Sequence, residues 1–199
     1  MLEYTGGKLH IPTISTAKSV QLIKEAKKKG LDVTCSVAVH NLFLTDDELH
    51  GFDANKKVNP PLRTEQDRKA LIKGIKDGII DMITTDHNPI DIEHKKVEFS
   101  TAKDGTIGLE SAFGALNTVL DIETIVKCLS DNPRKRFGLN SLSIKENEKA
   151  SLAIFNPNES YTFSEKNILS ASKNSVFLDK KLKGKAYGIY NKNQLILNS

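Results

Sequence analysis

Hydrophobic residues along the first 140 positions of the chain follow two alternating spacings. Three short apolar runs, rich in β-branched side chains, are typical of buried strands and cover residues 9–15, 31–39 and 79–85. Three longer stretches carry apolar positions at helical spacing and cover residues 16–29, 64–77 and 108–120. Because strands and helices alternate along the chain, the pattern predicts an α/β fold with a parallel sheet.

Residues at the ends of these stretches are typical helix boundaries. Thr16 and Thr64 stand where an N-cap is expected, and Gly30 and Gly78 stand where helices commonly end. Long loops are predicted between the regular elements, at residues 40–63 and 86–106. Shorter helices are predicted at residues 122–129 and 133–137.

From about residue 151 the pattern changes to short strands separated by turns. Residues 151–155 read as a strand that ends in a turn at Asn156-Pro157, and residues 183–190 and 194–197 read as a hairpin around Asn191-Lys192-Asn193. We therefore expect two parts, an α/β part in residues 1–150 and a small β-domain segment in residues 151–199.

Composition narrows the class of protein. The formal charge of +4 comes from lysines spread over predicted helix surfaces, and aromatic residues are not interleaved with them, so no nucleic-acid partner is expected. No apolar run approaches the roughly 20 residues that a membrane span needs, and the first residues do not resemble a signal peptide. These features predict a cytoplasmic protein with no membrane partner. Cys35 and Cys128 stand far apart in apolar surroundings and are expected to be buried, reduced thiols.

Three parallel strands are too few for a closed structure. A complete barrel of eight strands and eight helices takes about 250 residues, whereas this chain has 199. Three strands alone would leave long unpaired edges. We expect either a fragment or one part of a barrel that is assembled from more than one chain.

The strongest candidate for chemistry is Asp86, which directly follows the predicted strand 79–85. In a barrel of parallel strands, catalytic groups lie at the carboxyl ends of the strands. A carboxylate there can ligate a metal ion and can also move a proton to and from a metal-bound water. The structural alternative is that Asp86 caps a backbone amide in the next turn. Asn59 precedes Pro60-Pro61, where it can bind a ligand or only shape a turn.

Six segments occur in an order that is typical of one enzyme family. They are LHIPTIST at residues 9–16, VHNL at 39–42, KVNPPLR at 57–63, DGIID with TDHNP in 77–89, GTIGLE at 105–110, and the tail pair AIFNP and LKGK at 153–157 and 182–185. Together they resemble the C-terminal half of a dihydroorotase, a member of the metal-dependent amidohydrolase superfamily. The resemblance covers nearly the whole chain and implies the C-terminal portion of a (β/α)8 TIM-type barrel with a small appended β-domain.

The resemblance also implies a function. Dihydroorotases interconvert dihydroorotate and carbamoyl aspartate in pyrimidine biosynthesis and use zinc. Asp86 falls at the family's metal-ligating aspartate, which also acts as general acid and base. Asn59 falls at a substrate-binding position, and Gly105 falls on a loop whose backbone contacts the substrate ring. The partners implied are these small molecules, other copies of the chain in a homo-oligomer, and aspartate carbamoyltransferase.

Three departures from the family pattern favour an alternative. The second histidine of the family's H-x-x-H is Thr13 here, the histidine that closes D-H-A-P-H is Ile90, and the paired histidines of P-H-H-L are His40-Asn41. A hydroxyl is a poor zinc ligand, and an isoleucine side chain makes no hydrogen bond. The alternative is a catalytically inactive homologue that acts as a scaffold or partner subunit of another pyrimidine enzyme. The chain by itself is expected to be inactive.

Overall fold

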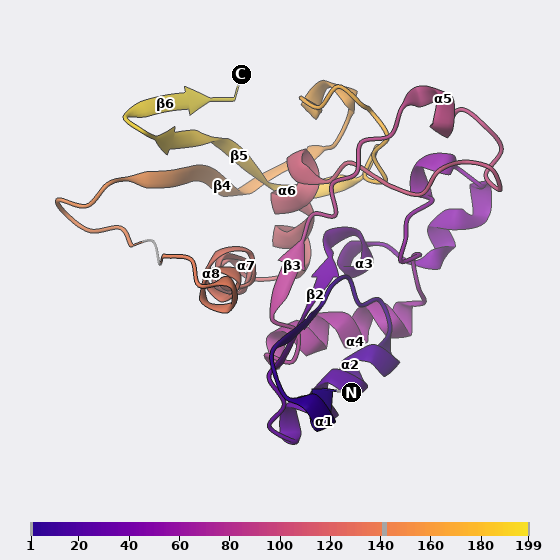
Figure 1. Cartoon of the computed structure of the whole chain (residues 1–199). Helices are drawn as coiled ribbons and strands as arrows, with labels where there is room; N and C mark the ends of the chain where they lie inside the picture. The colour runs from indigo at the N-terminus through magenta and orange to yellow at the C-terminus, as the bar shows by residue number, and fades with distance from the viewer. Residues whose placement is uncertain (1, 141–142, 199) are drawn as a thin grey trace.

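The computed structural model describes residues 2–140 and 143–198 of the chain, and these form two separate three-stranded sheets (Figure 1). The first sheet is parallel, has the order β1-β2-β3, and is built from β1 (Leu9–Ile11), β2 (Val33–Ala38) and β3 (Met82–Thr84). The second is antiparallel, has the order β4-β5-β6, and is built from β4 (Ser151–Thr162), β5 (Lys181–Asn191) and β6 (Gln194–Leu197). The predicted parallel sheet and C-terminal hairpin are confirmed. The parallel strands of the described residues form an open sheet and no closed barrel.

The three long helices form where the apolar spacing predicted them. They are α2 (Ala17–Lys28), α4 (Glu65–Lys76) and α6 (Leu109–Val119). Both predicted threonine caps are present, because the Thr16 side chain accepts a hydrogen bond from the Ser19 amide and Thr64 accepts one from the Asp67 amide. Leu109, the first residue of α6, is exposed, whereas Ala112 and Leu116 of the same helix are buried.

Shorter helical elements fill much of the remaining chain. They are α1 (Leu2–Thr5), α3 (Val39–Phe43), η1 (Asp46–Gly51), η2 (Ala54–Lys56), α5 (Ile92–Lys95), α7 (Ile122–Val126), the π-helical turn η3 (Lys127–Asp131), α8 (Asn132–Phe137) and η4 (Glu165–Asn167). The prediction of one long loop at residues 40–63 is therefore wrong. Three of these elements lie there and carry local backbone hydrogen bonds that the sequence pattern did not reveal.

The parallel strands are shorter than the sequence predicted. β1 ends at Ile11 because Pro12 has no amide hydrogen and Thr13 adopts a left-handed φ of +46°. β3 begins only at Met82, since the amides of Ile79 and Ile80 both bond back to the Gly74 carbonyl at the end of α4. In the second sheet the predicted strand was too short, because β4 extends over 12 residues and continues past the turn predicted at Asn156-Pro157.

Side chains of β2 alternate between two environments. Val33, Cys35 and Val37 belong to the hydrophobic core with residues of α2 and α4, whereas Thr34 and Ser36 line hollows on the other face. Both cysteines are buried and free, as predicted. Burial raises the pKa of the Cys35 thiol to about 12 and that of Cys128 to about 11, so both thiols stay protonated.

The antiparallel sheet shares its core with the α/β part. Phe163, Phe177 and Leu182 belong to the same hydrophobic cluster as the buried residues of β2 and α4. α6 provides the contact surface, and Gly114 on this helix lies so close to the β-segment that an added Cβ would stand 2.8 Å from the Tyr161 hydroxyl. A division of the chain at residue 150 stays a prediction.

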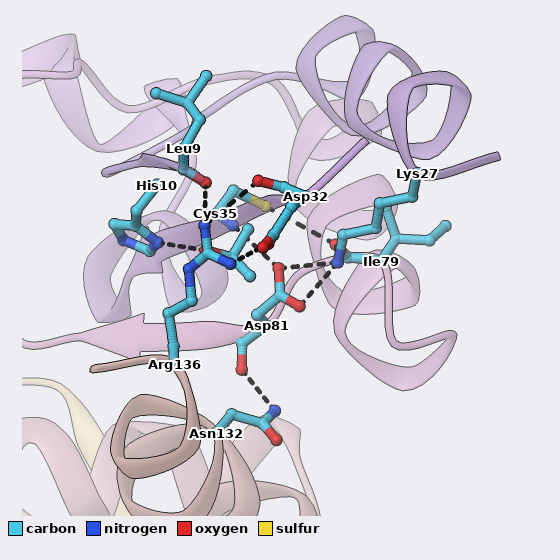
Figure 2. Close-up of polar contacts among 10 residues, drawn as sticks. Leu9, His10, Lys27, Asp32, Cys35, Ile79, Asp81, Asn132 and Arg136 are labelled. Carbon is cyan, nitrogen blue, oxygen red and sulfur yellow. Dashed lines mark hydrogen bonds and ion pairs between the residues drawn. The ribbon is translucent and has the colours of Figure 1, made fainter. Parts of the chain in front are cut away.

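Polar contacts hold the amino-terminal ends of the parallel strands together (Figure 2). Asp81, just before β3, pairs with Lys27 of α2 at 2.7 Å and accepts a hydrogen bond from the Cys35 amide at 2.9 Å. The Asn132 side chain donates to the Asp81 carbonyl at 2.7 Å. Arg136 of α8 donates to the Leu9 carbonyl at 2.8 Å. One carboxylate thus connects α2, β2 and β3, and α8 reaches from β3 to β1.

Candidate functional site

A hollow of about 440 Å³ lies over the polar face of the parallel sheet and extends past the carboxyl ends of β1 and β3. Among its lining residues are polar groups from all three strands and an aromatic residue of α8: His10, Thr13, Ser36, Thr84, Asp86 and Phe137. The sheet places them together because parallel strands bring their carboxyl ends to the same edge. Of the three site residues predicted from the sequence, Asp86 lines this hollow, and Asn59 and Gly105 do not.

Asp86 follows β3 by two residues and has a left-handed φ of +48°. Its amide donates to the Thr84 hydroxyl at 3.1 Å, which turns the chain directly after the strand. Within residues 2–140 and 143–198, its carboxylate accepts no hydrogen bond, so no contact supports the capping alternative. Burial raises the pKa of this half-buried carboxyl group above its ordinary value. A carboxyl group with a raised pKa and no fixed partner can take up and release a proton.

Gly105 lies beside the segment that follows Asp86. Its φ is +138°, and an added Cβ would stand 2.7 Å from the Asn88 side-chain nitrogen, so no other residue fits without a shift. The neighbouring Thr106 pairs with His87 in an isolated parallel bridge. The structure therefore brings the Gly105 loop against the end of the Asp86 segment.

Asn59 lies on an exposed loop that also reaches Gly105. The Gly105 amide donates to the carbonyl of Lys57, two residues before Asn59, at 2.9 Å. The Lys57 ammonium group donates to the carbonyls of Ser100 and Ala102 at 3.0 and 2.8 Å. These bonds fix the Asn59 loop to the loop that ends at Gly105, and the Gly105 loop in turn lies beside the segment after Asp86.

His87 has a structural role that the sequence did not reveal. Its Nδ1 atom accepts from the amides of Gly108 at 3.2 Å and Leu109 at 3.3 Å, the N-cap and the first residue of α6. In this arrangement Nδ1 acts as the acceptor and carries no hydrogen. The imidazole therefore occupies the two amides at the start of α6, which are not free to bind an anion.

His10 and Thr13, at and just after the end of β1, also line the hollow. The His10 side chain has partners within the fold, because its Nδ1 bonds the Thr34 hydroxyl at 2.9 Å and its ring packs edge-on against Phe137. Burial, helped by the charge of Arg136, lowers the pKa of His10. Thr13 is β-branched and yet has a positive φ, a strained conformation that Ser36 supports by accepting from its amide at 3.2 Å.

His40 neither faces the hollow nor anchors its loop. It is fully buried, and neither ring nitrogen has a hydrogen-bond partner among the described residues. Burial lowers its pKa to about 4, so it is neutral at pH 7. The loop anchor is instead Asn41, whose side chain donates to the Pro61 carbonyl at 3.2 Å.

Ile90 points to a different cavity. It lines a second hollow, of about 600 Å³, between the segment after β3 and residues 165–178. Its backbone is held there by Asn174, which accepts from the Ile90 amide at 3.1 Å, and by Ser172, which donates to the Ile90 carbonyl at 2.6 Å. Sequence reasoning missed Asn174, because the run Lys173-Asn174-Ser175 reads as an ordinary polar loop.

Comparison with known proteins decides the family. The family model described as the amidohydrolase family matches residues 9–181. The chain belongs to the amidohydrolase family. It is 50% identical over 184 residues to a dihydroorotase of Caldicellulosiruptor saccharolyticus, covering 89% of this chain and 43% of that protein. It is 45% identical over 186 residues to a dihydroorotase of Thermoanaerobacter sp., covering 90% of this chain and 43% of that protein. The chain thus spans less than half the length of these curated relatives.

Solved structures of other amidohydrolase-type proteins share the fold. An L-hydantoinase (dihydropyrimidinase) from Arthrobacter aurescens aligns with a TM-score of 0.87 at 21% identity, covering 99% of this chain and 46% of its own. An inactive dihydroorotase-like domain of a Chaetomium thermophilum CAD-like multifunctional protein aligns with a TM-score of 0.70 at 22% identity, covering 98% of this chain and 52% of its own. At such identities the likeness establishes the fold alone. This likeness supports an α/β amidohydrolase fold. The chain corresponds to part of that fold, and its parallel sheet is open.

Amidohydrolases are generally metal-dependent, and the site residues of this chain can be tested for that role. Within the described residues, no group of three or more His, Cys, Asp and Glu side chains could hold a metal ion. In the hollow, Asp86 and His10 are the side chains of these types, and Thr13 adds a hydroxyl. This set does not fit zinc, so no catalytic step is assigned to the metal here.

No helix of the described residues is long and apolar enough to cross a membrane.

Proposed function

We propose that this chain is part of a cyclic amide hydrolase of the dihydroorotase type and that it supplies the proton-transferring carboxylate, Asp86. The observation that carries the proposal is the state of this carboxyl group. It lines the hollow at the end of β3, it accepts no hydrogen bond from the described residues, and burial raises its pKa. The identity of 50% to a dihydroorotase over most of the chain supports the substrate class.

The chemistry requires a proton to move between two atoms. Water adds to the ring carbonyl of dihydroorotate, the ring C–N bond breaks, and the departing nitrogen must gain a proton. An ionised carboxylate takes the proton from the attacking water, and the carboxylic acid so formed gives that proton to the departing nitrogen, which is general base and then general acid catalysis. We assign this role to Asp86, and we assign substrate contacts to the Asn59 side chain and the Gly105 backbone.

The experiment measures hydrolysis of dihydroorotate and the reverse condensation of carbamoyl aspartate by the full-length gene product and its Asp86→Asn variant. We expect the variant to lose at least about 100-fold in kcat, since a positioned general acid and base contributes about 10²–10⁴-fold. Asp91→Asn is the matched control, because Asp91 lies on the same segment but lines the second hollow. Equal kcat values for Asp86→Asn and wild type would contradict the assignment. Zinc content is measured separately by elemental analysis.

A second candidate function has its own supporting observation. Thr13 presents a hydroxyl to the hollow where the family pattern has an imidazole, and Ile90 lies at the other cavity. These departures favour an inactive homologue that serves as a scaffold or partner subunit, for which aspartate carbamoyltransferase is the candidate partner. Absence of turnover by the full-length protein, together with a stable complex with that enzyme in size-exclusion chromatography, would favour this alternative. Under either proposal we expect a cytoplasmic homo-oligomer.

A further inference from the structure

Asn174 joins the two loops that border the candidate site. It lies between η4 and β5, and it is among the few buried polar residues of the described chain, with a 4% exposed fraction. Buried polar side chains are stable only when their hydrogen bonds are made. The partners of Asn174 therefore show what this residue does.

The side-chain amide contacts both loops at once. Its Nδ2 atom donates to the Asn88 carbonyl at 3.1 Å and to the Gly105 carbonyl at 3.2 Å. Its Oδ1 atom accepts from the Ile90 amide at 3.1 Å and also contacts the Ser172 hydroxyl. An asparagine side chain has two donor hydrogens and two acceptor positions. Both hydrogens and one acceptor position are fully used, and the second acceptor position shares the single Ser172 hydroxyl hydrogen with the Ile90 carbonyl.

The backbone of Asn174 adds a second set of bonds to the Gly105 side. Its carbonyl accepts from the Ile107 amide at 3.0 Å and from the Thr106 hydroxyl at 3.2 Å. The Thr106 hydroxyl in turn accepts from the Val176 amide at 2.9 Å. The two loops also touch directly, since the Asn88 amide donates to the Thr106 carbonyl at 2.8 Å. One residue thus holds segments that are separated by many positions in the sequence.

We propose that Asn174 is a positioning residue, which holds the backbone after Asp86 against the Gly105 loop and so fixes the proton-transferring carboxylate relative to the substrate-contacting backbone. The inference rests on the proposed function. Asp86 begins this segment in a left-handed conformation, and a strained conformation persists only where the surrounding structure over-determines it. The bonds from Asn174 supply that constraint on the far side of the segment.

The test compares two asparagine-to-aspartate substitutions in the full-length gene product. Asn174→Asp keeps the size of the side chain but replaces two N–H donors by an oxygen that faces two carbonyls. Asn117→Asp is the matched control, because the Asn117 amide also donates to two carbonyls, those of Pro157 at 2.8 Å and Lys183 at 2.9 Å, between α6 and the β-segment.

We expect Asn174→Asp to lower kcat for dihydroorotate about 100-fold and to raise KM at least about threefold, because displacements near 1 Å in an active site have effects of this size. A merely structural role would reduce the amount of folded enzyme and leave KM unchanged. The amides of Asn88, Ile90 and Ile107 should also lose protection from hydrogen exchange, while those of α2 keep it. Asn117→Asp should change none of these quantities.

The inference is overturned if Asn174→Asp keeps kcat, KM and amide protection within about twofold of wild type. It is also overturned if Asn117→Asp changes these quantities as much as Asn174→Asp does. If wild type shows no turnover, the proposed function fails, and hydrogen exchange alone then decides whether Asn174 holds the loops. Loss of protection confined to the amides of Asn88, Ile90 and Ile107 supports the positioning role of Asn174, whereas uniform loss or no loss overturns it. Should Asn174→Asp fail to fold, Thr106→Val removes the hydroxyl contacts from the opposite loop and must produce the same local loss of protection.

Discussion

Two aspartates flank β3, and their surroundings are opposite. Asp81, before the strand, pairs with Lys27 and accepts from the Cys35 amide. Asp86, after the strand, accepts no hydrogen bond from the described residues and has a positive φ. The amino-terminal end of the sheet is thus saturated with polar contacts, and the carboxyl-terminal end holds an unpaired carboxylate. This division is the one expected of barrel strands, in which the first end serves stability and the second serves chemistry.

The largest expected effect on stability is at the saturated end. Asp81→Ala should lower the free energy of unfolding by about 3 kcal/mol, because it leaves the Cys35 amide without its acceptor and the Lys27 ammonium group with the Ile79 carbonyl in place of the carboxylate. Denaturation in urea measures the change. Asp77→Ala is the control, since it removes an exposed pair with Lys73 and should cost at most about 1 kcal/mol. Equal losses in the two variants would contradict the comparison.

His40 should make stability depend on pH at the other end of the sheet. Its folded-state pKa of about 4 lies below the ordinary 6.5, so the folded state resists protonation. Its contribution is therefore fully present above pH 6.5 and is lost as the pH falls from 6.5 to about 4, on the order of 2–3 kcal/mol in total. His40→Met should flatten the stability profile in this window. His50→Gln, which changes an exposed histidine, should leave it as in wild type, and two identical profiles for His40→Met and wild type would refute the expectation.

A substitution at Gly105 tests how tightly the loops at the carboxyl end fit. Gly105→Ala should cost about 1–3 kcal/mol in unfolding free energy, because the new Cβ would meet the Asn88 side chain at 2.7 Å and the φ of +138° is unfavourable for alanine. Thermal unfolding measures the loss. Gly51→Ala has open space and an ordinary φ, so its melting temperature should stay near that of wild type. A Gly105 variant as stable as the Gly51 variant would show that the loops are loose.

The smallest expected effect on stability is at Asp86. Asp86→Asn should change the unfolding free energy by less than about 1 kcal/mol near pH 4, since no hydrogen bond to the carboxylate is lost. Because the pKa of Asp86 is raised in the folded state, its contribution to stability is fully present below the ordinary pKa and is lost as the pH rises through the raised value. The unfolding free energy of the variant should therefore increase relative to that of wild type as the pH rises. A variant that loses stability at high pH would reveal a structural role for the carboxylate.

Local patterns predicted the regular elements well, because their causes are local. The apolar spacing of α2, α4 and α6 and the threonine caps Thr16 and Thr64 act within a few residues. Strand ends were predicted less well, because they depend on where an amide finds its partner. The amide of Ile80, for example, bonds to the end of α4 and not to β2.

The candidate site divides in the same way. Motifs in order along the chain were enough to identify the family, and the strand pattern singled out Asp86 at the end of a strand. Three features emerge only from the folded chain: His87 caps α6, Ile90 lines a second cavity, and Asn174 binds a carbonyl 86 positions away. The physical reason is distance along the chain. A hydrogen bond between remote segments leaves no periodicity or local composition in the sequence, and it exists only once the fold has brought its two partners together.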